Sequence, residues 1–176
     1  ALRQARADKV PAEGASSLWN PQIFGGGSLV DEPEERSDAS ALPEFSTVIF
    51  HCGGAGARPG KDGLSATAFP SGVRTIPVEA TESIAPIVFY RREFREHSGG
   101  AGEFRGGLGQ VMEVGTLDTA PFGLSAYYDR IDHPPRGREG GLAGAAGRVT
   151  LTSGKVLRGK GLQTVSSSER VIIEMP

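Results

Sequence analysis

Apolar residues occur in this chain in short runs, and nearly every run ends at glycine or proline. The 176 residues include 26 glycines and 12 prolines, well above ordinary usage. The runs are rich in β-branched and aromatic residues, and none sustains the 3.6-residue repeat of a long amphipathic helix. The sequence therefore predicts a mainly β fold, a glycine-rich sandwich or barrel-like sheet with long loops and at most short helices. We expect strands at residues 44–51, 73–81, 87–92, 110–115, 124–131, 148–152, 162–166 and 170–175, and one or two helical turns within residues 1–10.

The charges of the chain nearly cancel, which argues against polyanionic partners. Lys and Arg number 19 and Asp and Glu number 21, so the formal net charge is -2. Such a chain has no strong positive field to hold nucleic acid or an anionic membrane surface. Its apolar runs also fall far short of the roughly 18 residues that a membrane-spanning helix needs.

Cysteine usage and the two ends of the sequence suggest its setting. Cys52 is the only cysteine, which excludes an internal disulfide and is typical of a reducing, cytoplasmic compartment. We expect Cys52 to be a small buried side chain at a strand end. The chain starts at Ala1 without an initiator Met and ends at Pro176 directly after an apolar run. We interpret residues 1–176 as a single domain cut from a longer protein.

Two nucleotide-binding motifs are approached but not completed. The segment GKVLRGKG at 154–161 nearly matches a phosphate-binding loop, but Gly161 stands where the motif needs Ser or Thr, and the residues that follow are typical of a strand. The dinucleotide motif fails because Pro59 and Arg105 occupy the positions of the third glycine in the two candidate segments. The sequence predicts no nucleotide site within this segment.

Two carboxylates in the stretch PVEATESIAP are candidate catalytic groups. Glu79 and Glu82 lie among apolar residues, and burial would raise the pKa of a carboxyl group toward values useful for acid or base catalysis. A structural role is the other interpretation: the carboxylates accept backbone N–H bonds from a glycine loop, or pair with Arg58 or Arg105.

Glycine-rich segments precede two arginines and suggest a site for an anionic group. GGAGAR ends at Arg58, and GGAGEFR, which begins with Gly99 and Gly100, ends at Arg105. Glycine lets backbone N–H groups approach an anion closely, and arginine supplies a fixed positive charge. His97, just before the second segment, is either a cap or a ligand contact.

These motifs together resemble a known family. The carrying segments are GGAGARPGKDG at 53–63, PVEATESIAPIVF at 77–89, HSGGAGEFRGGLGQ at 97–110, RIDHPPRGREGG at 130–141 and the terminal VIIEMP. In order and spacing they are similar to the C-terminal part of the hydantoinase B/oxoprolinase family. That family includes beta subunits of N-methylhydantoinases, 5-oxoprolinases, and large subunits of acetone and acetophenone carboxylases.

The resemblance implies a function for the chain. It implies part of an ATP-dependent hydrolase that opens a cyclic amide or imide, with ATP bound by a hydantoinase A-like partner subunit or domain. The alternatives are a ketone carboxylase subunit and a non-catalytic interface module. Within this interpretation Glu79 and Glu82 are the candidate catalytic residues, and Arg58, His97, Gly99, Gly100 and Arg105 are the candidate substrate contacts.

The resemblance does not assign every functional residue of the family to this chain. In the carboxylase branch the metal ligands belong to an earlier part of the chain, so no metal ligand is assigned here and a divalent metal is expected only outside this segment. His97 stands where the family more often has aspartate, which argues against an essential acid at that position.

Overall fold

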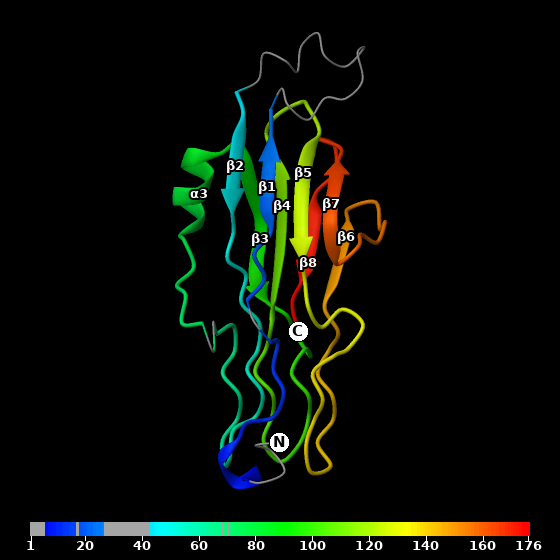
Figure 1. Ribbon diagram of the computed structural model, residues 1–176. Coiled ribbons are helices and arrows are strands. Elements are labelled where there is room, and N and C mark those ends of the chain that lie inside the picture. The colour runs from blue at the N-terminus through cyan, green and yellow to red at the C-terminus, as the bar shows by residue number, and fades with distance from the viewer. Residues whose placement is uncertain (1–5, 17, 27–42, 68, 70) are drawn as a thin grey trace.

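The computed structural model describes residues 6–16, 18–26, 43–67, 69 and 71–176, and it consists mainly of two four-stranded antiparallel sheets (Figure 1). The first sheet has the order β2-β1-β5-β7 and the second has the order β3-β4-β8-β6. Neither sheet closes into a barrel. The strands of the first sheet are β1 (Gln22–Gly25), β2 (Phe45–Val48), β5 (Phe122–Tyr127) and β7 (Lys160–Val165), and those of the second are β3 (Ile87–Phe94), β4 (Gln110–Thr116), β6 (Arg148–Leu151) and β8 (Val171–Glu174).

The core lies between the two sheets, as in a sandwich. Alternate residues of the paired strands point inward, so Ile23 and Leu124 of the first sheet share one buried cluster with Met112, Val114 and Ile173 of the second. Burial of these large side chains is the main force that holds the sheets together.

Extended glycine-rich segments continue from one end of the sandwich (Figure 1). We call segments 11–15, 53–66, 98–108 and 141–145 the glycine bundle. Backbone hydrogen bonds between them recur at every third residue, which is the repeat of a polyproline II helix. The bonds with this spacing are Ala12 N–H to Ala57 O with Ala15 N–H to Gly54 O, Gly63 N–H to Arg105 O with Ala66 N–H to Leu108 O, and Leu142 N–H to Ala101 O with Ala145 N–H to Ser98 O.

Seven of the eight predicted strands are confirmed, and the predicted strand at 73–81 is wrong. In its place the structure has a short helix, α3 (Val78–Ile84). Pro77 precedes the helix and Pro86 follows it, and within this window local bonds from Thr81 N–H to Pro77 O and from Ala85 N–H to Thr81 O close single turns. The β-branched residues indicated a strand, but a segment this short, bounded by prolines, satisfies its backbone groups locally.

Two smaller differences concern the N-terminal part. Strand β1 was not predicted, because only Ile23 and Phe24 separate Gln22 from glycine. The helical turns expected within residues 1–10 are represented by the 3-10 turn η1 (Ala7–Lys9), and residues 1–5 lie outside the described residues. Within the described part of the chain, no helix has the length and apolar character that a membrane span requires.

Candidate functional site

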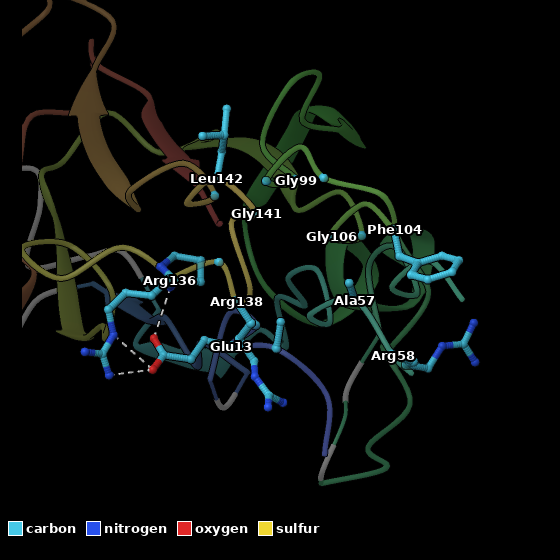
Figure 2. Close-up of a pocket in the computed structure, with 18 of the residues that line it drawn as sticks. Glu13, Ala57, Arg58, Gly99, Phe104, Gly106, Arg136, Arg138, Gly141 and Leu142 are labelled. Atoms are coloured by element: carbon cyan, nitrogen blue, oxygen red, sulfur yellow. Dashed lines mark hydrogen bonds and ion pairs between the residues drawn. The ribbon is translucent and has the colours of Figure 1, made fainter. Parts of the chain in front are cut away.

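A cleft of about 630 Å³ lies in the loop-built end of the molecule (Figure 2). Its walls come from four parts of the sequence that the glycine bundle brings together, residues 8–14, 54–60, 98–107 and 135–144. Backbone from these segments forms most of the surface, because many lining positions are glycine or alanine.

The lining glycines are required by close backbone packing. A Cβ atom added at Gly54 would lie 2.0 Å from Gly107 O, and one at Gly99 would lie 2.1 Å from Gly106 O. At Gly100 the added atom would lie 2.2 Å from Leu142 O. Contacts this short are not found for real Cβ atoms, so these glycines allow neighbouring segments to touch through their backbones.

Glu13 is the most strongly anchored charged group in the cleft. Its carboxylate accepts bonds from Arg130 Nη1 at 3.0 Å and from Arg136 Nη2 at 2.8 Å, and it also accepts the backbone N–H of Arg136 (Figure 2). These bonds, chiefly those from the Arg136 side chain, lower the pKa of Glu13 to about 2. The carboxylate therefore ties the N-terminal segment to the loop at 130–138.

Two further arginines line the cleft. Arg138 Nη1 donates to Val10 O, and its Nη2 lies 3.8 Å from the Glu139 carboxylate. Arg58 Nε donates to Asp62 O at 2.9 Å, and its side chain extends outward at the side of the cleft away from Glu13 (Figure 2). Among the described residues, Arg58 forms no ion pair with a carboxylate.

The structure brings together three of the residues proposed from the sequence. Arg58, Gly99 and Gly100 all line the cleft. Arg105 and His97 are exposed and are not among the lining residues. The Asp62 carboxylate accepts the backbone N–H of Arg105 at 2.8 Å, which joins the loop of Arg105 to the turn of Arg58.

Glu79 and Glu82 lie on α3, apart from the other candidates. In Figure 1 this helix is beside β2 and β3, at the end of the molecule opposite the glycine loops. Glu79 is exposed, whereas Glu82 is partly buried and its Oε1 accepts the backbone N–H of Phe89 at 2.8 Å. Glu82 therefore ties α3 to β3. Neither carboxylate contacts Arg58 or Arg105, and the backbone N–H that Glu82 accepts comes from strand β3 and not from a glycine loop.

The family model for hydantoinase B/oxoprolinase matches residues 1–176, which is the whole chain. The chain belongs to the hydantoinase B/oxoprolinase family. The resemblance predicted from the sequence segments is thus confirmed, and the cleft is built largely from those same segments.

Relatives within the family are much longer than this chain. The 5-oxoprolinase of Dictyostelium discoideum is 32% identical over 129 residues, which cover 70% of this chain and 10% of that protein. A protein of Pseudomonas sp. (strain NS671), named as the B-type subunit of a D-/L-hydantoinase, is 33% identical over 100 residues, which cover 56% of this chain and 17% of that protein.

Two solved structures share the fold. The ATP-dependent caprolactamase from Pseudomonas jessenii superposes with a TM-score of 0.72 and 24% identity, covering 100% of this chain and 31% of that one. A nucleotide-free acetone carboxylase superposes with a TM-score of 0.63 and 19% identity, covering 94% of this chain and 25% of that one.

The near-match to a phosphate-binding loop at 154–161 is not completed in the structure. The near-match to a phosphate-binding loop leads into β7, a strand, whereas phosphate binding of that type uses the N-terminus of a following helix. Among the described residues, no group of three His, Cys, Asp or Glu side chains is placed to hold a metal ion.

His51 and Cys52 are buried at the junction of the sandwich and the glycine bundle. His51 Nε2 lies 3.2 Å from Gln110 O, and burial, with the nearby Arg92 charge, lowers the pKa of His51 to about 4. Burial also raises the pKa of the Cys52 thiol. The prediction that Cys52 is a small buried side chain is confirmed.

Proposed function

We propose that residues 1–176 form part of the B-type subunit of an ATP-dependent hydrolase that opens a cyclic amide or imide ring. The observation that carries this proposal is the match of the hydantoinase B/oxoprolinase family model to residues 1–176. Relatives named as a hydantoinase subunit and as 5-oxoprolinases favour the same class of substrate. ATP would bind to a hydantoinase A-like partner subunit or domain, since the near-match to a phosphate-binding loop at 154–161 leads into strand β7 and not into a helix.

The proposed reaction needs an activated ring carbonyl. ATP would transfer its γ-phosphoryl group to the carbonyl oxygen and leave as ADP. A first water would add to the carbon, and the ring C–N bond would break to give an open-chain acyl phosphate. A second water would then hydrolyse the acyl phosphate to the open-chain acid and phosphate. Residues 1–176 would shelter the activated intermediate from bulk water. In this role the cleft supplies Arg58, whose guanidinium has no carboxylate partner among the described residues, to a phosphate or carboxylate oxygen.

The test compares two arginines in the complete enzyme. Arg58→Ala should lower kcat/KM for substrate-dependent ATP hydrolysis at least tenfold, about 1.4 kcal/mol of transition-state stabilisation. Arg105→Ala is the matched control for the cleft, since Arg105 lies close to Arg58 in the fold but does not line the cleft. Full activity of a folded Arg58→Ala enzyme would show that Arg58 in this cleft does not bind the activated intermediate. A loss confined to Arg105→Ala would move the anion contact to the exposed side of the loop.

A non-catalytic interface module is the second candidate, and under it the charged contacts of the cleft have only a structural role within this chain. Arg130 and Arg136 are held by Glu13, and Arg138 by Val10 O. Each of these bonds joins segments of this chain to one another. Under this proposal Arg58→Ala and Arg105→Ala leave turnover unchanged, and variants that break the Glu13 contacts reduce assembly with the partner subunit before they reduce turnover.

The likeness to acetone carboxylase makes ketone carboxylation a third outcome to measure. ATP hydrolysis by the complete enzyme should be assayed with hydantoins, 5-oxoproline and small lactams, and separately with small ketones plus bicarbonate. Stimulation by ketones alone would replace the hydrolase proposal with the carboxylase one.

A further inference from the structure

The outward faces of the two sheets differ in charge. On the second sheet, five of ten outward positions are charged, and cross-strand ion pairs such as Arg170–Glu113 at 3.0 Å and Arg95–Glu174 at 3.6 Å border that face. A surface of this kind is well suited to water. The ten outward positions are Val88, Arg91, Glu93, Val111, Glu113, Gly115, Arg148, Thr150, Ile172 and Glu174. Val111 and Thr150 are buried, and Tyr90 at the β3 bulge lies over Gly115 on the same face.

The outer face of the first sheet carries one charge. Its inward residues, such as Ile23 and Leu124, are buried, so the alternate residues point outward. This face has ten outward positions, and Lys160 is the only charged residue among them, so none of the ten is a carboxylate. The positions are Gln22, Phe24, Ser46, Val48, Gly123, Ser125, Tyr127, Lys160, Leu162 and Thr164.

Large apolar side chains on this face are exposed and adjacent. Tyr127 is 75% exposed, Leu162 is 57% exposed and Val48 is 40% exposed. In the pairing of β5 with β7, Tyr127 lies opposite Lys160, and Leu162 is two residues further along β7. Tyr127 and Leu162 are therefore diagonal neighbours on the same face. Helix α3 lies at the β2 and β3 edge and leaves them exposed (Figure 1). With Phe24, each of the four strands thus presents one large apolar side chain on this face, with Gln22 and Ser125 between them.

The size of the face bears on what covers it. Four strands about 4.8 Å apart, at about 3.3 Å per residue, give it roughly 400 Å². A free-standing protein–protein interface buries about 800 Å² on each partner, so this face is too small to hold a second copy by itself. A surface on the same polypeptide is present at high effective concentration, so a small contact is sufficient to keep it in place.

We propose that this face is an internal interface, covered in the complete B-type subunit by an uncharged, largely apolar surface from another part of the same polypeptide. The proposal rests on the proposed function, in which residues 1–176 are one part of a longer subunit. The length of the relatives supports it, since this chain covers only 31% of the caprolactamase chain with which it superposes. An apolar covering surface would bury no unpaired carboxylate, because none of the ten outward positions carries one. The long side chain of Lys160, at the border of the face, can extend to water.

Thiol labelling of the complete subunit tests the proposal. Tyr127→Cys places a thiol on the face, and Leu117→Cys places one at a residue that is 70% exposed in the β4–β5 turn. Both are made in a subunit without other reactive cysteines and are labelled with a maleimide under native conditions and in denaturant. We expect native labelling of Tyr127→Cys to be at least tenfold slower than that of Leu117→Cys, with equal rates in denaturant.

Each outcome decides the proposal. Equal native rates overturn it, and so does oxidation of Tyr127→Cys to a disulfide-linked dimer, which would assign the face to a second copy. Leu162→Cys replaces Tyr127→Cys if that variant does not fold, and Val156→Cys, at a residue 64% exposed, is a second reference. ATP-dependent turnover is measured separately on the parent enzyme, so a failure of the proposed function is distinguished from a failure of this interface.

Discussion

Gly54 illustrates why some glycine positions of the bundle accept no side chain. Alanine at this position would place its Cβ 2.0 Å from Gly107 O, which is backbone and cannot move aside alone. We expect Gly54→Ala to lower the free energy of unfolding by about 3 kcal/mol, at the upper end of overpacking effects. Urea denaturation measures this. Gly102→Ala is the control, because its added Cβ would lie 3.2 Å from the nearest atom, Phe104 O, and should cost under about 1 kcal/mol. Equal losses for both variants would contradict the packing explanation.

Glu13 gives the molecule a dependence on acidic pH. Its pKa is lowered to about 2 from an ordinary value of 4.5, so its contribution to stability is complete above about pH 4.5 and is lost as the pH falls toward 2. Arg136 is largely exposed and solvent screens it, so we expect about 1 to 2 kcal/mol. Urea midpoints of the wild type and Glu13→Gln should therefore differ at pH 7 and converge near pH 2. A constant difference across this range would show that the carboxylate charge is not responsible.

The contacts of Glu13 with Arg130 and Arg136 could not be predicted from the sequence. Glu13 is 117 residues from Arg130 and 123 from Arg136, and no local spacing relates them. The two arginines entered the sequence argument only as part of the segment 130–141, which carries the family resemblance. Arg58, Gly99 and Gly100 could be placed together from the sequence, because each belongs to one of two similar glycine segments that the bundle brings side by side.

At the level of elements, strands β2 to β8 were predictable, whereas β1 and α3 were not. Strands β3 to β8 coincide with short apolar runs bounded by glycine, proline or polar turn residues. The composition and the length of each run therefore both indicate a strand. In α3 these signals disagree, because Val78, Thr81 and Ile84 favour a strand while the flanking prolines allow only a short local structure. The polyproline II spacing of the glycine bundle was also unpredictable, since the repeat is in hydrogen bonds between segments and not in glycine positions along the chain.

Glu82 tests whether α3 has a structural role. Because its carboxylate accepts the Phe89 N–H, Glu82→Ala should lower the free energy of unfolding by about 1 to 2 kcal/mol. Its position apart from the cleft predicts that turnover of the folded complete enzyme is unchanged. Glu79→Ala, at an exposed position on the same helix, should alter neither quantity. A large loss of kcat in a stable Glu82→Ala enzyme would support the interpretation of Glu82 as a catalytic residue.

At the scale of the whole molecule, the proposed binding of ATP by a partner subunit or domain predicts that catalysis needs more than this chain. The described residues form a sandwich and a glycine bundle, and their one near-match to a phosphate-binding loop runs into strand β7. Purified residues 1–176 should therefore give no ATP hydrolysis stimulated by a cyclic amide, whereas the complete subunit with its ATP-binding partner should give it. The measurement is phosphate release with and without substrate, and circular dichroism of the β type checks that the isolated chain is folded. Substrate-stimulated phosphate release by the folded chain alone would place an ATP site within it and would require a phosphate-binding arrangement other than a loop before a helix.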